Sequence, residues 1–337
     1  MIALQDQRSG WGALDEYDGR LGPEAAAEVA RTFGPERKLS ASALRQFGSC
    51  PYTFFAERVL RLEEIEEPGE DVDRALLGNT VHRCLSLFFE RWRPHREDLR
   101  IEPEDRDAAV EVLDAVITGV FEDEARLGTV GDEVIFGIER EKARQDLHAW
   151  LDYEIEHMQA EGHTAWLMEQ QFGYERAEPV RIGEGERRVL LRGRVDRIDR
   201  LGEIDGAPAF AVYDYKTGSI PAKTRMKDGG DFQLPVYALA GRRIVDDPNA
   251  VCADWAYYSI RRPIDLKSRP RKRDPVADIE ECIAAACAWA LKYAAAIRGG
   301  SFSPGPRGAC AKWCSLRGVC RWDEFRFARK QGGGRDE

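Results

Sequence analysis

The chain has 337 residues, of which 43% are hydrophobic and 33% are charged. This is enough apolar material for a sizeable core, which excludes a fully disordered chain, and at about 150 residues per domain the length corresponds to one large or roughly two smaller domains. The 50 basic and 60 acidic residues give a net charge of −10, which excludes a uniformly basic nucleic-acid binder but not a local basic groove. No apolar run reaches the roughly 18 residues of a membrane span, and the amino terminus lacks a signal-peptide pattern, so we expect a cytoplasmic protein with no membrane partner.

The first half of the chain is predicted to be helical and acidic. Residues 1–38 are polar and are predicted to form a lead-in or linker segment. Apolar residues then recur at helical spacing over 76–92, and again around 110–120 and 147–158, which predicts helices. Residues 101–161 carry 18 acids and 5 bases, a net charge of −13, so we expect this region to face solvent rather than a nucleic acid.

The second half changes to patterns typical of a sheet. Segments rich in β-branched and aromatic residues predict strands over 166–174, 187–199, 210–218 and 253–260. Helices are predicted over 230–244 and 276–297. We therefore expect an α/β fold with a mixed sheet flanked by helices. No G-x-x-x-x-G-K-[ST] loop is present, which excludes a P-loop NTPase.

The strand FAVYDYKTG carries the most informative charges. Side chains alternate along a strand, so Asp214 and Lys216 share one face, which begins with two apolar residues. If 187–199 and 209–217 form a hairpin, Asp196 lies near the same end. Converging carboxylates suit Mg²⁺ or Mn²⁺, and a neighbouring lysine can stabilise developing negative charge, which together favour phosphodiester hydrolysis. The alternative is a surface ion pair, because D-x-K is short and common.

Three of the eight cysteines cluster in GACAKWCSLRGVCRW, with C-x3-C-x5-C spacing: Cys310, Cys314 and Cys320. Disulfides are a poor explanation in a reducing compartment, whereas short-spaced thiolates converge easily on a metal or cluster. Cys50 is the candidate fourth ligand because a proline follows it, as it often follows cluster-ligating cysteines. Zinc held by four thiolates is the alternative. The other four are predicted to be small buried residues: Cys84, Cys252, Cys282 and Cys287.

The segment 261–273 contains seven bases and one acid, a net charge of +6, and is predicted to be a loop. It either contacts DNA phosphates or is a solvated charged loop, and both readings stay open. Its candidate DNA-binding residues are Arg269, Arg271, Lys272 and Arg273. Arg192, Arg194 and Arg197, which lie beside Asp196 in the sequence, are further candidates.

Taken in order, several short motifs resemble a known family. They are S-x-S-A-L, C-P-Y-x-F-F, G-N-T-V-H, G-R-V-D-R-I, Y-D-Y-K-T-G, Q-L-P-V-Y and the three late cysteines. The series is similar to the RecB-like branch of the PD-(D/E)xK nucleases, and within it to the iron–sulfur nuclease domain of AddB-type helicase–nuclease subunits. The resemblance covers roughly residues 38–326.

The resemblance implies a restriction-endonuclease-like sheet and a set of site residues. The metal ligands that it implies for Mg²⁺ or Mn²⁺ are His82, Asp196, Asp214 and the Tyr215 carbonyl. Lys216 would be the catalytic lysine. The family's Q-x-x-x-Y motif, which positions DNA, falls on Gln233 and Tyr237.

The resemblance also implies a [4Fe-4S] cluster that staples the carboxy-terminal tail to the amino-terminal helices. Its ligands would be Cys50, Cys310, Cys314 and Cys320. The family spacing is C-x2-C-x5-C, so the first gap here is one residue longer. The implied layout is a lead-in at 1–38, a nuclease domain at 39–326 and a flexible tail at 327–337. The nuclease domain divides into a helical part (39–165), a catalytic core (166–300) and a Cys-rich tail (301–326).

The function that the resemblance implies is a DNA exonuclease in recombination or repair. It would act on single-stranded ends with 5′→3′ polarity, in association with a helicase or a helicase–nuclease subunit. Two alternatives stay open: a CRISPR-adaptation nuclease of the same branch, and a non-catalytic iron–sulfur DNA-binding module.

Overall fold

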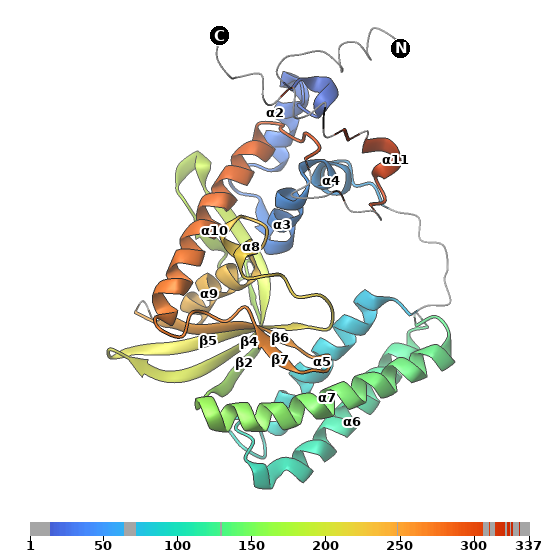
Figure 1. Cartoon of the computed structure of the whole chain (residues 1–337), viewed down its shortest axis with the longest axis vertical. Coiled ribbons are helices and arrows are strands. Elements are labelled where there is room, and N and C mark those ends of the chain that lie inside the picture. Colours follow the sequence, from blue (N-terminus) through green and yellow to red (C-terminus); the bar gives the residue numbers. More distant parts are fainter. Residues whose placement is uncertain are drawn as a thin grey trace.

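A curled sheet lies between two helical layers in the computed structural model of this chain (Figure 1). The structure describes residues 14–63, 72–128, 130–247, 249–305, 310, 314–320, 322, 323, 325 and 330. Within this part of the chain, no helix is both long and apolar enough to cross a membrane.

The longest strand, β4 (Val189–Ile204), organises the sheet because four other strands pair with it. The remaining strands are β1 (Lys38–Ser40), β2 (Thr164–Phe172), β3 (Val180–Ile182), β5 (Ala207–Lys216), β6 (Val251–Ser259) and β7 (Asp265–Lys267). The order is β1-β4-β5-β6-β7, with β2 and β3 also paired to β4. The β5–β6 pair is parallel and the β4–β5 pair antiparallel, so the predicted mixed sheet and the predicted hairpin are both confirmed.

One face of the sheet is covered by helices from both ends of the chain. These are α2 (Pro23–Thr32), α3 (Ala41–Ser49), α4 (Pro51–Phe54), α8 (Thr224–Lys227), α9 (Gln233–Ile244) and α10 (Pro275–Arg298). Phe210 and Val212 of β5 pack into this layer together with Leu234 of α9. Helix α2 lies inside the segment predicted as a lead-in, and its Val29 joins the same core.

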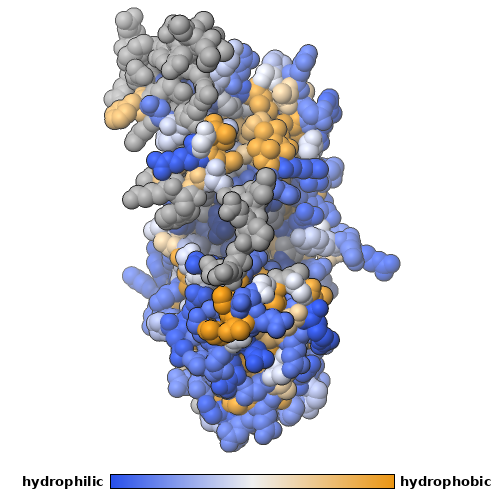
Figure 2. Space-filling view, turned by 90° about the vertical axis from the view of Figure 1, so that its right-hand side faces the viewer, coloured by the Kyte–Doolittle hydropathy of each residue, from blue (hydrophilic) through white to orange (hydrophobic). Residues whose placement is uncertain are grey.

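The opposite face is covered by α5 (Arg74–Trp92), α6 (Arg106–Arg126) and α7 (Glu133–Glu161). Asp73 and Asp132 cap the first turns of α5 and α7 by accepting backbone hydrogen bonds, as short acidic side chains commonly do at this position. Tyr213 and Tyr215 of β5 pack into this layer, so successive residues of β5 serve the two cores alternately. The outer surface of this layer, low in the view of Figure 2, is mostly hydrophilic, in keeping with its acidic sequence.

The segment 261–273, predicted as a loop, contains a short strand. Residues Asp265–Lys267 form β7 and pair antiparallel with β6. This pairing gives the basic segment a fixed position along one edge of the sheet.

Candidate active site

The β4–β5 hairpin brings two predicted carboxylates together. Arg197 pairs with Tyr213 and Ile198 with Val212, so the register places Asp196 opposite Asp214. Residues directly opposite in an antiparallel pair point to the same face. Both carboxylates are buried, with 6% of Asp196 and 1% of Asp214 exposed.

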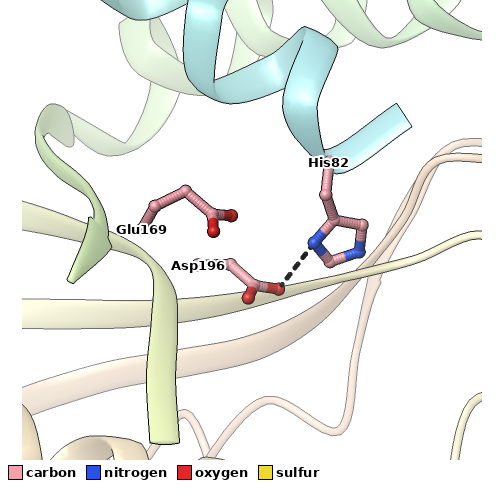
Figure 3. A group of neighbouring side chains, drawn as sticks. All are labelled: His82, Glu169 and Asp196. Carbon is pink, nitrogen blue, oxygen red and sulfur yellow. Dashed lines mark ion pairs between the residues drawn. The ribbon is translucent and has the colours of Figure 1, made fainter. Parts of the chain in front are cut away.

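His82 reaches this strand end from α5, on the other side of the sheet. Its Nε2 lies 3.0 Å from the carbonyl oxygen of Tyr215. Its Nδ1 lies 3.4 Å from Oδ2 of Asp196 (Figure 3). The backbone N–H of Tyr215 donates to the same Oδ2 of Asp196 at 2.9 Å. His82 therefore contacts two other predicted ligand groups, the Tyr215 carbonyl and the Asp196 carboxylate.

Glu169 completes this group and was not identified from the sequence. The β2–β4 register runs from Met168 opposite Arg197 to Gln170 opposite Val195, which leaves Glu169 opposite Asp196. Its φ of 53° is left-handed, which is uncommon for a residue other than glycine. Ligand atoms of His82, Glu169 and Asp196 lie within 4.8 Å of one another (Figure 3). The available signal was an acidic residue inside the apolar strand WLMEQQFGY.

Lys216 and Gln233 form a hydrogen-bonded set with Asp214. The Lys216 ammonium pairs with Oδ2 of Asp214 and donates to Oε1 of Gln233 at 3.0 Å. The amide of Gln233 then donates to Oδ1 of Asp214 at 3.0 Å. Tyr237, one turn further along α9, is 8% exposed and interacts with Gln233 through its hydroxyl. The predicted Q-x-x-x-Y pair thus lies beside the D-x-K strand.

The electrostatics of the site reflect its crowded negative charge. Burial raises the pKa of Asp196 well above its usual value, and Asp214 and Glu169 raise it further. Burial also raises the pKa of Asp214, against the opposing effect of Lys216. Burial and then Lys216 lower the pKa of His82 to about 4, so its imidazole is neutral near pH 7. A neutral imidazole among carboxylates is a typical donor set for a divalent cation.

The four cysteines predicted as cluster ligands come from both ends of the described chain. Cys50 lies between α3 and α4, and Cys320 ends α11 (Arg317–Cys320). Burial raises the pKa of the Cys320 thiol, and the thiols of Cys50, Cys310 and Cys314 raise it further, so each of these three lies near Cys320. Of the cysteines predicted to be core residues, three are fully buried and one is half-buried: Cys84, Cys252, Cys282 and Cys287.

The basic residues predicted to bind DNA differ in their surroundings. Arg269 forms ion pairs with Asp254 and Glu161, and Arg271 forms ion pairs with Asp278 and Glu281. Lys272 and Arg273 are exposed.

Among the arginines beside Asp196, Arg194 pairs with Glu169, whereas Arg197 is fully buried. The expectation that Arg197 contacts DNA was wrong, because its side chain points into the core between the sheet and α7.

Comparisons with known proteins agree with this geometry. Residues 38–321 match the family model described as the PD-(D/E)XK nuclease superfamily. The chain is 29% identical over 259 residues to an ATP-dependent helicase/deoxyribonuclease subunit of Moorella thermoacetica, covering 74% of this chain and 22% of that protein. It is 30% identical over 275 residues to the protein of the same name from Symbiobacterium thermophilum, covering 78% of this chain and 23% of that protein. The chain therefore spans less than a quarter of the length of these curated relatives.

Proposed function

Because the chain belongs to the PD-(D/E)XK nuclease superfamily, we propose that it is a metal-dependent deoxyribonuclease that hydrolyses phosphodiester bonds at single-stranded DNA ends. The observation that carries this proposal is the convergence of His82, Glu169 and Asp196 within 4.8 Å, next to the Asp214–Lys216 pair. An incidental surface ion pair would not place a neutral imidazole and three carboxylates at one buried strand end.

The donor set fits a hard divalent cation such as Mg²⁺ or Mn²⁺. The Nε2 of His82 and the carbonyl oxygen of Tyr215 have a separation of 3.0 Å. Oδ2 of Asp214 is buried and pairs with the Lys216 ammonium, and a carboxylate oxygen has a second lone pair that a cation can use. These groups and Asp196 would hold the ion, and Glu169 lies close enough to join them.

A bound divalent ion supplies an activated water and shields phosphate charge. Lys216 is held between Asp214 and Gln233, which supports a role for its ammonium in stabilising the negative charge that develops on the scissile phosphate. Gln233 bridges the lysine and the carboxylate and orients both. Tyr237, one turn further along α9, interacts with Gln233 through its hydroxyl and would help to orient that amide.

The test is hydrolysis of end-labelled single-stranded DNA in Mg²⁺ or Mn²⁺, for the parent and for Lys216→Ala. The variant should lose cleavage but still bind the strand in EDTA, because Lys216 acts on the transition state. Labels at each end in turn report polarity, for which we propose 5′→3′, and circular substrates separate exonuclease from endonuclease action. Cleavage by Lys216→Ala at the parental rate would contradict the proposed site.

We further propose that Cys50, Cys310, Cys314 and Cys320 hold a [4Fe-4S] cluster that fixes the chain's late segment to the α3–α4 region. The effect of the other three thiols on the pKa of Cys320 supports their proximity to it. Thiolates are the ligands that such clusters use, and a link between positions 50 and 310 closes most of the chain into a loop. The expected role is structural.

Anaerobic purification with iron, sulfide and zinc analysis tests this assignment. Cys320→Ser should lose iron and lower the melting temperature, whereas the half-buried Cys287→Ser should retain both. Zinc without sulfide in the parent would assign the thiols to a zinc site instead.

The relatives named as helicase/deoxyribonuclease subunits support a helicase partner and a role in recombination or repair. Co-purification of this chain with a helicase subunit is the corresponding measurement. The complete set of His82, Asp196, Asp214 and Lys216 disfavours a non-catalytic DNA-binding module.

A further inference from the structure

A cavity of about 810 Å³ lies between α5, α7 and the segments that follow β5 and β6. Its volume is within the range of sites that bind small ligands, roughly 300–1,000 Å³. Apolar side chains from three of these segments line it, including Leu77, Val81 and Ile260. We call it the α5–α7 pocket.

The α5–α7 pocket is lined by residues next in the chain to those of the proposed active site. Val81 immediately precedes His82 on α5, and Thr217 immediately follows Lys216. The backbone N–H of Ile260 donates to the carbonyl of Lys216 at 2.9 Å. A strand whose phosphate occupies the metal site would therefore have its adjoining nucleotide at the mouth of this pocket.

The charges around the pocket favour an anion. Two of its cations are already paired, Lys142 with Glu139 and Arg262 with Asp146. Two others, Arg74 and Arg261, are exposed and form no ion pair within the described part of the chain. The pocket therefore combines an apolar wall with two arginines available to a ligand.

We propose that the α5–α7 pocket binds the nucleotide next to the scissile phosphate of a single-stranded DNA substrate. The apolar wall receives the base and sugar, and Arg74 and Arg261 contact the adjoining phosphates. An unpaired nucleotide has the required mixture of an apolar face and an anionic backbone. This inference rests on the proposed nuclease function and deepens it by assigning the strand's position.

The test measures binding separately from cleavage. A short fluorescein-labelled oligothymidylate is titrated with the full chain in EDTA at several salt concentrations. Removing two phosphate contacts should reduce the slope of log affinity against log salt by about 1.4, at about 0.7 per contact for single strands. The Arg74→Ala/Arg261→Ala variant should show this reduction and an affinity on the order of 10-fold weaker at low salt.

Arg93→Ala is the matched control, because Arg93 is an exposed arginine at the opposite end of α5 from Arg74. It should retain parental affinity and slope. Parental affinity and slope in the double variant would overturn the proposal.

A second variant fills the pocket without changing its charge. Ala143 lines the pocket from α7, so Ala143→Trp should weaken binding while leaving the salt slope unchanged. Undiminished affinity in a folded Ala143→Trp protein would also overturn the assignment.

The nuclease function and the role of the pocket can be contradicted independently. A parent that binds the oligonucleotide but hydrolyses nothing with Mg²⁺ or Mn²⁺ contradicts the nuclease function. A parent that hydrolyses DNA, with pocket variants that bind it normally, contradicts the pocket alone.

Discussion

Two clusters of buried charge lie on opposite faces of β4, and they are one residue apart in sequence. On one face, Asp196 meets Asp214 and Glu169 at the proposed metal site. On the other face, the fully buried Arg197 pairs with Asp199 of its own strand and with Glu154 of α7. Strand alternation sends neighbouring charged residues to these two environments.

The second cluster is closed. The Arg197 guanidinium lies between two carboxylates, with N–O distances of 2.7 Å to Glu154 and 2.5 Å to Asp199. The Tyr258 hydroxyl donates to the other oxygen of Glu154 at 2.8 Å. Arg197 lowers the pKa of Glu154 against the opposing effect of burial, whereas the pKa of Asp199 stays raised by burial. Every member has a protein partner, and the cluster joins α7 to the sheet.

The first cluster is open. It contains three carboxylates and a neutral imidazole from His82, with Lys216 paired to Asp214 and Arg194 paired to Glu169, so three carboxylates share two cations. Burial raises the pKa of Asp196 and of Asp214. The closed cluster shows that β4 can bury charged side chains when each has a protein partner. The excess negative charge of the open cluster is therefore one that a bound cation would neutralise.

Removing a carboxylate from the open cluster should have the largest effect on activity. We expect Asp214→Asn to reduce DNA cleavage by about 10³-fold or more, because a ligand and the partner of Lys216 are lost together. The free energy of unfolding should be unchanged or higher at pH 7, because burial raises the pKa of this carboxyl and so disfavours its charged form in the folded state. Initial rates on labelled single strands and urea unfolding measure the two effects.

Breaking the closed cluster should give the opposite pattern. Arg197→Met leaves Glu154 and Asp199 buried without their cation, which should lower the free energy of unfolding by about 3–5 kcal/mol. Urea unfolding at pH 7 measures this change. Arg194→Met is the control, because Arg194 lies on the same strand but is half-exposed, and it should change the free energy by less than about 1 kcal/mol. Equal stability of the two variants would refute the distinction between the clusters.

A smaller effect is expected at Glu169, the member of the open cluster that only the structure identified. Glu169→Gln should raise the Mg²⁺ concentration for half-maximal cleavage by about 10-fold, since it alters a group beside the metal ligands without removing them. A Mg²⁺ titration of cleavage rate measures it. A lowered maximal rate with unchanged Mg²⁺ dependence would assign Glu169 to another role.

The smallest effect is on thermal stability. At a Mg²⁺ concentration ten times the dissociation constant, binding should stabilise the parent by about 1.4 kcal/mol and raise its melting temperature by a few degrees. Asp214→Asn should lose this increase, whereas Arg197→Met should start from a lower temperature and retain it. An equal rise in the melting temperature of Asp214→Asn would show that Mg²⁺ stabilises the protein at a site other than the open cluster.

Local sequence pattern determined much of this protein. The spacing of apolar residues predicted the helices and strands, because core-facing residues recur with a different period in each of these two elements. The expected hairpin and the two-residue alternation of β5 predicted that Asp214, Lys216 and Asp196 lie at one strand end, and the register of β4 on β5 agrees. Residues on two adjacent strands of a hairpin are close because the chain connects them directly.

The tertiary structure decided what depends on distant segments. Glu169 joins the site through the register of β2 on β4 and a left-handed backbone turn, neither of which its local sequence specifies. His82 meets Tyr215 because α5 docks across the sheet, 133 residues away in sequence. Sequence proximity grouped Arg197 with Asp196 as a site residue, but Arg197 is buried against α7 and pairs with Glu154 there. Arg269 and Arg271 form ion pairs with carboxylates of other elements. A side chain's partners are set by long-range packing, so a one-dimensional pattern can propose which charges matter but not which of them remain available to a ligand.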